Sequence, residues 1–359
     1  MINKKRTITT FLDLVRIDSP SGEEETVRKE LANRLKKLGS KVEMDSYGNL
    51  IAHIDGKGES FLLNAHMDTV EPGRGIKPVV DGDIIKTDGS TILGGDPKAG
   101  VTAILEALAS AKEDGKAVRA LDIVFTIGEE TGLHGAMNLD YTKVRAKQGV
   151  TFDGERSVEC VDIAAPGYHR IDAKIIGRSA HAGAVPEKGI SAIKIASEII
   201  SQLGLGRIDK ETTANIGLIT GGSARNAIPE LVHFQGEIRS LDKQKLAKHT
   251  KHFEDVFNKV QGRYSEAVVE MLIEKECDPY NFSLDTPLLQ YLKKIYKKLG
   301  MHPKFKPTGG ASDVNILTAH GITIVDVGTG GEELHTTREY VRISEMVKTA
   351  QFCEALLVI

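Results

Sequence analysis

Short apolar segments alternate with a helical segment in the first part of the chain, and this alternation restricts the fold more than any other feature. The apolar segments are "SFLLNA" (60–65), "ALDIVFTI" (120–127) and "GVTF" (149–152), and a helix is expected over 98–112. Strands that are apolar on both faces belong to sheets covered by helices. The sequence therefore predicts an α/β fold with a mainly parallel mixed sheet flanked by helices.

The pattern changes near Ala165. From there to Glu276 the expected order is strand, helix, strand, strand, helix, strand, which is the split βαβ arrangement of small two-layer domains. After Cys277 the α/β pattern returns, and 359 residues exceed one ordinary core. We therefore expect an α+β domain, residues 165–275, inserted into a larger domain formed by residues 1–164 and 276–359.

Four helices of the larger domain besides 98–112 can be placed from apolar spacing. They are expected over 5–16, 23–38, 286–299 and 343–357. In "DSPSGEE", Ser21 precedes a run of glutamates that suits the positive end of a helix, so we expect this segment to cap the second helix.

Composition excludes several classes of partner. The chain has 47 basic and 50 acidic side chains, a net charge of −3, so neither nucleic acid nor an anionic membrane is expected to bind it. No segment reaches the roughly 18 apolar residues of a membrane helix, and no apolar signal-peptide core follows the charged N-terminus. The cysteines, Cys160, Cys277 and Cys353, are odd in number and far apart, which favours a reducing cytoplasm. We expect a small-molecule partner.

Polar side chains follow the apolar strands at the point where each strand ends. They are His66, Asp68, Glu129, Glu130, Asp153 and, in a glycine-rich loop, His335. Each one alone is compatible with a structural role. The carboxyl ends of parallel strands meet at one edge of a sheet, however, where α/β proteins place their sites. Carboxylates with two imidazoles suit zinc, cobalt or manganese.

The segment "ILGGDPKAG" (92–100) has two interpretations. Asp96 can cap the following helix, with Pro97 at the first helical position. Alternatively, an aspartate that offers both oxygens suits a pair of metal ions.

The motifs "AHMDTV", "GGDPKAG", "GEETG", "FDGE" and "ELHTTREYV" occur in this order, with the inserted domain between the last two. Together they resemble the cocatalytic zinc metallopeptidases that include peptidase T, aminoacylase and carboxypeptidase G. "TFDGE" and the "LGxDxKAG" form are most similar to the peptidase T branch, the tripeptide aminopeptidases. The resemblance implies a zinc-exopeptidase fold in which the larger domain is catalytic and the inserted domain is a lid and a dimerisation surface.

The resemblance also implies a role for each residue. Asp96 would bridge two divalent ions, with His66 and Asp153 completing one site and Glu130 and His335 the other. Glu129 would be the general base, and Asp68 would orient the His66 ring. The residues expected to contact substrate are His181, Asn226, Arg239, Gly309 and Gly310.

The chain departs from the family at Pro97. Relatives have Asp or Asn there, after a cis peptide bond. A cis bond costs about 2.5–4 kcal/mol before an ordinary residue and about 0.5–1 kcal/mol before proline, so the sequence predicts a cis Asp96–Pro97 bond.

Metal-dependent hydrolysis of an amide bond is the leading prediction, with an aminopeptidase acting on short peptides as the favoured form. A carboxypeptidase or a deacylase acting on N-acyl amino acids is the alternative, because Asn226 and Arg239 would also suit a free carboxylate. A non-catalytic metal or peptide binder stays open. A nucleotide-binding oxidoreductase is suggested only by "GTGGEE", which lacks the full GxGxxG pattern.

Overall fold

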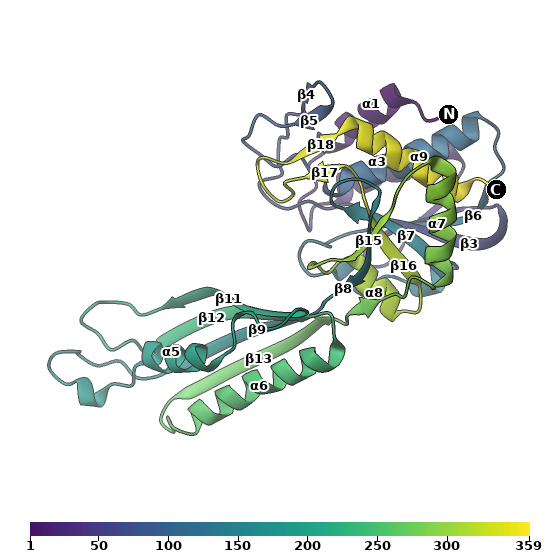
Figure 1. Ribbon diagram of the computed structural model, residues 1–359. Coiled ribbons are helices and arrows are strands. Elements are labelled where there is room, and N and C mark those ends of the chain that lie inside the picture. Colours follow the sequence, from purple (N-terminus) through teal and green to yellow (C-terminus); the bar gives the residue numbers. More distant parts are fainter. The chain divides into compact units, whose positions relative to one another are not determined.

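The computed structural model describes all 359 residues, which form two compact units (Figure 1). Unit 1 comprises Met1–Ile163, Phe282–Thr308 and Ser312–Ile359, and unit 2 comprises Ala164–Asn281 and Gly309–Ala311. No helix combines the length and the apolar character needed to cross a bilayer.

A nine-stranded mixed sheet belongs mainly to unit 1. Its strands are β1 (Lys41–Met44), β2 (Leu50–Ile54), β3 (Lys57–His66), β6 (Arg119–Thr126), β7 (Gln148–Gly154), β8 (Cys160–Ala165), β14 (Tyr280–Asn281), β15 (Lys304–Pro307) and β16 (Thr323–Gly328). Strand β14 and the last two residues of β8 are assigned to unit 2. The order is β1-β2-β6-β3-β7-β16-β8-β14, with β15 paired to β8. The central strands β6, β3, β7 and β16 are parallel, and the outer pairs are antiparallel. The predicted fold class is therefore confirmed.

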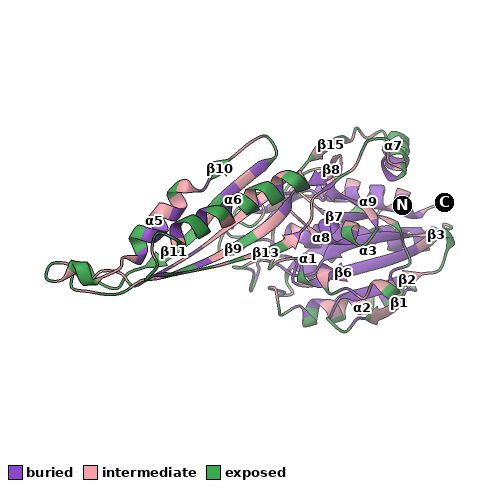
Figure 2. Ribbon diagram, turned by 90° about the horizontal axis from the view of Figure 1, so that it is seen from below, coloured by how far each residue is buried: buried purple, intermediate pink, exposed green.

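Helices cover both faces of this sheet because its central strands are apolar on both sides. The helices of unit 1 are α1 (Lys4–Val15), α2 (Glu25–Leu38), α3 (Gly95–Glu113), α4 (His134–Met137), α7 (Pro287–Leu299), α8 (Asp313–Ala319) and α9 (Ile343–Leu357). On one face, Leu63 and Ala65 of β3 join a hydrophobic core with residues of α3 and α9. On the other face, Thr126 of β6 donates a hydrogen bond to Asp313, the first residue of α8. Figure 2 shows the central strands buried along most of their length.

The expected cap at Ser21 is wrong. The second helix begins at Glu25, its N-cap residue is Glu24, and no side chain caps it. The Ser21 hydroxyl instead donates a hydrogen bond to Asp68 Oδ2 at 2.6 Å. Ser21 therefore makes a hydrogen bond to a buried carboxylate 47 residues later in the chain instead of the expected bond to the amides of the second helix.

A small antiparallel sheet joins two distant segments of unit 1. Its order is β17 (Gly331–Glu332), β18 (Tyr340–Arg342), β5 (Ile84–Lys86) and β4 (Val79–Asp81). The loop between β17 and β18 contains His335, and β5 precedes the segment that leads into α3. The pairing of β18 with β5 therefore brings the His335 loop close to the start of α3.

Unit 2 has one antiparallel sheet with two helices. Its elements are β9 (Gly167–Ile176), α5 (Ala192–Gln202), β10 (Gly206–Arg207), β11 (Thr212–Gly221), β12 (Leu231–Ser240), α6 (Lys243–Gln261) and β13 (Val268–Cys277). The strand order is β10-β11-β12-β9-β13. Helices α5 and α6 cover one face, where Ile171, Phe234 and Phe253 belong to the core (Figure 1).

Candidate metal centre

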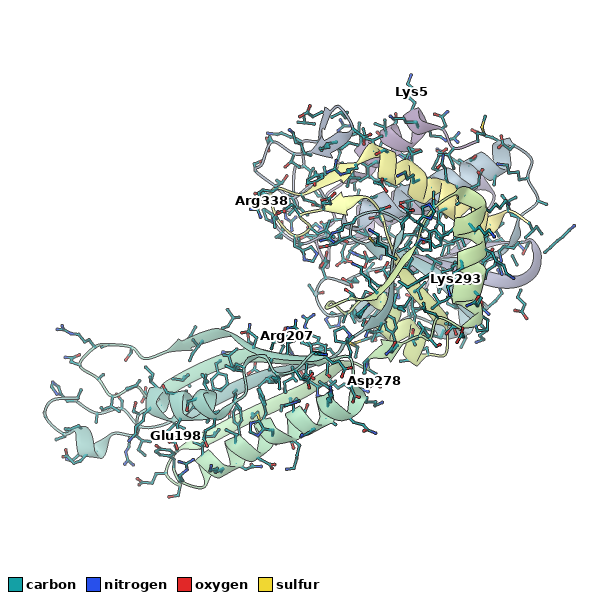
Figure 3. The ribbon with its side chains drawn as sticks, viewed as in Figure 1. Lys5, Glu198, Arg207, Asp278, Lys293 and Arg338 are labelled. Atoms are coloured by element: carbon teal, nitrogen blue, oxygen red, sulfur yellow. The ribbon has the colours of Figure 1, made fainter.

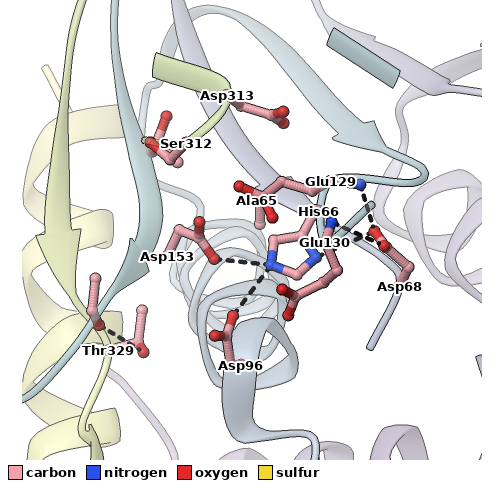
Figure 4. Close-up of polar contacts among 12 residues, drawn as sticks. Ala65, His66, Asp68, Asp96, Glu129, Glu130, Asp153, Ser312, Asp313 and Thr329 are labelled. Carbon is pink, nitrogen blue, oxygen red and sulfur yellow. Dashed lines mark hydrogen bonds and ion pairs between the residues drawn. The ribbon is translucent and has the colours of Figure 1, made fainter. Parts of the chain in front are cut away.

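Three neighbouring parallel strands bring their polar residues to one edge of the large sheet. His66 is the last residue of β3, Asp153 lies at the end of β7, and Glu129 and Glu130 follow β6. Because these strands are parallel neighbours, the four side chains converge (Figure 4).

Asp96 joins this cluster from the start of α3. Its backbone is not helical (φ −80°, ψ 113°), and the Asp96–Pro97 peptide bond is cis, as the sequence predicted. Oδ1 of Asp96 lies 3.0 Å from His66 Nε2, and Oδ2 lies 3.1 Å from His335 Nε2. The two oxygens of one carboxylate therefore contact two different imidazoles.

A further carboxylate accompanies each imidazole. His66 Nε2 lies 3.0 Å from Asp153 Oδ1, and His335 Nε2 lies 3.1 Å from Glu130 Oε1. The donor atoms of His66, Asp96 and Asp153 lie within 4.8 Å of one another, as do those of Asp96, Glu130 and His335. The cluster thus contains two triads that share Asp96.

Glu129 and Glu130 lie in a turn, because β6 ends at Thr126 and the amides of Gly132 and Leu133 both donate to Glu129 O. Both carboxylates reach the cluster, and each has an oxygen within 4.8 Å of a His66 nitrogen. Asp68 holds this turn. Its Oδ1 accepts from Glu129 N at 3.0 Å and its Oδ2 from Glu130 N at 3.2 Å.

Burial and mutual repulsion dominate the electrostatics of the cluster. Burial raises the pKa of Asp153 to about 7 and raises that of Glu129 well above its usual value. Hydrogen bonds to Asp96 and Glu130 raise the pKa of His335 to about 10. So many acidic groups in a low-dielectric site require compensating positive charge, which bound divalent ions supply while restoring the ionised carboxylates.

A further observation supports the binding of divalent metal ions by the side chains of this cluster. Two buried carboxylate oxygens, Glu130 Oε1 and Asp153 Oδ1, accept no hydrogen bond, although each lies close to an imidazole nitrogen, of His335 and His66 respectively. Buried oxygens without donors are costly unless a cation accompanies them. Imidazole nitrogens with carboxylate oxygens, and no thiolate, match the preferences of zinc, cobalt and manganese.

Other buried acids contact the cluster, and the sequence analysis did not identify them. Glu339 accepts hydrogen bonds from the amides of Leu93, Gly94 and Asp96. Asp326 Oδ1 accepts from Asp153 N at 3.0 Å. The only sequence signal for these two residues was an acidic residue within or directly beside an apolar strand, as in "TIVDVG" and "REYV".

The five residues expected to contact substrate lie in unit 2, where they form two groups. Ala182 N donates to Asn226 O at 2.9 Å, so the His181 and Asn226 loops lie side by side, and His181 Nδ1 accepts from Gly183 N and Ala184 N. The Nη1 atom of Arg239 donates a hydrogen bond to Gly309 O at 3.3 Å. Gly310 follows in the same short segment.

The fold and this cluster define a metal-dependent hydrolase. Residues 163–265 match the model of the peptidase dimerisation domain, and residues 49–154 match that of peptidase family M28. The uncharacterised protein YqjE of Bacillus subtilis is 38% identical, with 99% of both chains covered.

Two solved structures are similar over almost the whole chain. Aminopeptidase PepT from Bacillus cereus is 35% identical with a TM-score of 0.91, and a tripeptidase from Staphylococcus aureus is 35% identical with a TM-score of 0.94. Both alignments cover 99% of this chain and 98% of the other. The chain belongs to the dinuclear metallopeptidase family that includes peptidase T, and it is a peptidase.

Proposed function

We propose that this protein is an aminopeptidase that hydrolyses short peptides, tripeptides above all, and that it uses two divalent ions, most simply zinc. The observation that carries the proposal is the placement of Asp96, whose two oxygens contact His66 and His335. One carboxylate shared by two separate donor sets suits a pair of ions. The names of the two similar structures, an aminopeptidase and a tripeptidase, support the choice of substrate.

In this proposal Asp96 would offer one oxygen to each ion. His66 and Asp153 would hold one ion, and Glu130 and His335 would hold the other. When bound, the two ions lower the pKa of a water molecule and polarise the scissile carbonyl.

Glu129 is the proposed general base. It takes a proton from the attacking water and delivers it to the leaving amine, for which a carboxylate with a raised pKa is suited. Glu129 is 9% exposed, so bulk water does not compete strongly for its proton. Asp68 orients the His66 ring from the side opposite the metal-facing nitrogen.

Unit 2 supplies the proposed substrate contacts: His181, Asn226, Arg239, Gly309 and Gly310. The Arg239 guanidinium is already engaged, because Nε and Nη2 donate to Glu237 at 2.9 and 3.1 Å. A substrate carboxylate would have to compete with Glu237 for these donors. The choice of an aminopeptidase over a carboxypeptidase or a deacylase therefore rests on the two similar structures and not on Arg239.

Terminal blocking distinguishes these activities. We would reconstitute the metal-free protein with Zn²⁺ and assay one tripeptide in three forms: unblocked, N-terminally acetylated and C-terminally amidated. An aminopeptidase cleaves the amidated peptide and not the acetylated one. Cleavage of the acetylated peptide alone would favour the carboxypeptidase or deacylase alternative, and no cleavage of any form would contradict the proposal.

We also propose that the protein forms a homodimer through unit 2, because residues 163–265 match the peptidase dimerisation domain. Light scattering after size exclusion should give twice the chain mass of 39.0 kDa. A monomer at micromolar concentration would contradict this proposal and leave the proposed hydrolysis unaffected.

A further inference from the structure

Glu339 occupies an unusual place for a glutamate. Its side chain is 1% exposed, and it follows Arg338, which points outward into solvent (Figure 3). Glutamate is rarely buried unless it is fully hydrogen-bonded. Its contacts account for this burial.

The Glu339 carboxylate accepts three backbone hydrogen bonds from the segment that leads into α3. Oε2 accepts from Leu93 N at 2.7 Å and from Gly94 N at 2.8 Å, while Oε1 accepts from Asp96 N at 3.1 Å. These amides belong to a turn in which Gly94 has a left-handed backbone (φ 69°) and Asp96 is not helical. The carboxylate therefore holds the backbone in the conformation that directs the Asp96 side chain into the cluster.

Gly95 makes this approach possible. A Cβ atom at residue 95 would lie 3.0 Å from Glu339 Oε1 and 2.4 Å from Val341 Cγ2. The turn and the β18 segment are thus in direct contact, with no room for a side chain between them.

The same segment also carries His335. Glu339 N donates to Thr336 O at 3.1 Å, and His335 itself has a left-handed backbone (φ 60°). Glu339 therefore joins the backbone of Asp96 to the loop that presents His335. The remaining member of this triad, Glu130, is held separately through the bond from its amide to Asp68.

We propose that Glu339 is a positioning residue that sets the spacing between Asp96 and His335, and thereby the affinity of one of the two metal sites. The inference rests on the proposed metal-binding function. His66 and Asp153 lie on strands β3 and β7, so their triad depends less on Glu339. Loss of Glu339 should weaken the Asp96–Glu130–His335 site more than the other.

The test measures Zn²⁺ binding to the metal-free protein by equilibrium dialysis, which needs no activity. The Glu339→Gln variant keeps the size of the side chain but turns an NH2 group toward backbone donors. It should bind one ion at least about tenfold more weakly than the wild type does, the scale on which groups that support metal ligands act, and the other ion with a clearly smaller loss of affinity. Two ions bound with unchanged affinities would overturn the inference.

Asp122→Asn is the matched control. Asp122 is also buried and its carboxylate also accepts two backbone hydrogen bonds, from Arg145 and Ala146, but it lies toward the amino end of β6. This variant should bind two ions as the wild type does. An equal loss of metal in Asp122→Asn would mean that general destabilisation explains the result, and would overturn the positioning role.

Double variants identify the affected site. His335→Ala already removes the Asp96–Glu130–His335 site. Adding Glu339→Gln to this variant should therefore change the Zn²⁺ affinity of the remaining site less than about twofold. In an Asp153→Asn background, adding Glu339→Gln should weaken the remaining ion at least about tenfold. The reverse pattern would contradict the assignment.

Two further results keep the test decisive. If Glu339→Gln does not fold, Gly95→Ala perturbs the same contact from the other side and should show the same selective loss; normal binding of both ions would overturn the inference. If wild-type protein binds no Zn²⁺, the proposed function fails and the inference with it. Two ions bound equally by wild type and variant would overturn the inference alone.

Discussion

Asp68 Oδ1 lies 3.2 Å from Nδ1 of His66, which is the last residue of β3 and precedes Asp68 by two residues. This contact leaves His66 Nε2 directed at Asp96 and Asp153. Burial opposes the negative charge of Asp68, but hydrogen bonds, from His66 above all, outweigh burial and lower the pKa of Asp68. An ionised Asp68 fixes the His66 proton on Nδ1 and leaves Nε2 free to bind a metal ion.

The Asp68→Asn variant should therefore bind Zn²⁺ about 10–100-fold more weakly than the wild type. The reason is that the side-chain NH2 group of asparagine would face groups that donate hydrogen bonds to the Asp68 carboxylate. Equilibrium dialysis measures this. Ser21→Ala is the control, since it removes only the hydroxyl that donates to Asp68 Oδ2. A larger effect of Ser21→Ala than of Asp68→Asn would contradict the orienting role.

The Glu129→Gln variant should lose about 10²–10⁴-fold in kcat, the range expected for a missing general base. Its metal content should stay at the wild-type value, because the proposal gives Glu129 no metal to hold. The measurements are steady-state rates on an unblocked tripeptide and metal analysis of the same sample. Glu25→Gln, an exposed change on α2, should leave both unchanged. Wild-type turnover by metal-loaded Glu129→Ala would rule out the assigned mechanism.

Removal of metal should destabilise the protein, because the buried carboxylates of the cluster then repel one another. At free Zn²⁺ about 100-fold above the dissociation constant of a site, the ion bound at that site contributes about 2.7 kcal/mol to the free energy of unfolding. Thermal unfolding with and without a chelator measures the difference, and added Zn²⁺ should restore the melting temperature. An Asp96→Asn variant should respond less to the chelator. Identical melting temperatures for wild type in both conditions would contradict the prediction.

Acid should also remove the contribution to stability made by Asp122, which lies toward the amino end of β6. His53 Nδ1 lies 2.8 Å from Asp122 Oδ1, and Arg145 Nε donates to the same oxygen at 2.9 Å. Burial opposes the charge of Asp122, but these hydrogen bonds outweigh it and lower its pKa. A lowered pKa in the folded state stabilises the protein above the unfolded-state pKa of about 3.9, and this contribution is lost as the pH falls through the folded-state value.

Asp122→Asn should therefore lower the free energy of unfolding by about 2 kcal/mol at pH 7. The gap between wild type and variant should narrow below a pH of about 4. Urea unfolding of both proteins in the presence of a chelator measures this gap. A gap that stays constant or widens in acid would contradict the prediction.

The convergence of His66, Glu129, Glu130 and Asp153 could be predicted because it depends on local signals. An apolar run marks each strand, and parallel neighbours end at the same edge. The alternation of strand and helix likewise identified the parallel core, which the structure confirms.

The supporting acids could not be predicted in this way. Glu339 accepts from amides more than 240 residues earlier, and Asp326 from an amide 173 residues earlier. No spacing rule connects such positions, and a charged residue in "TTREYV" looks like an ordinary surface glutamate. Ser21 shows the opposite error. The neighbouring residues in the sequence predicted that Ser21 caps a helix, but its hydroxyl donates to Asp68, 47 residues later in the chain.

The order of segments along the chain has a consequence for synthesis. Unit 1 is interrupted by unit 2, and β16, His335 and Glu339 all follow the interruption. A nascent chain that ends at Asn281 contains His66, Asp96 and Asp153 but lacks β16, one of the two strands that pair with β7. Translation must therefore pass through the whole of unit 2 before the proposed metal centre can be complete, so we expect truncated chains that end before His335 to lack the proposed activity.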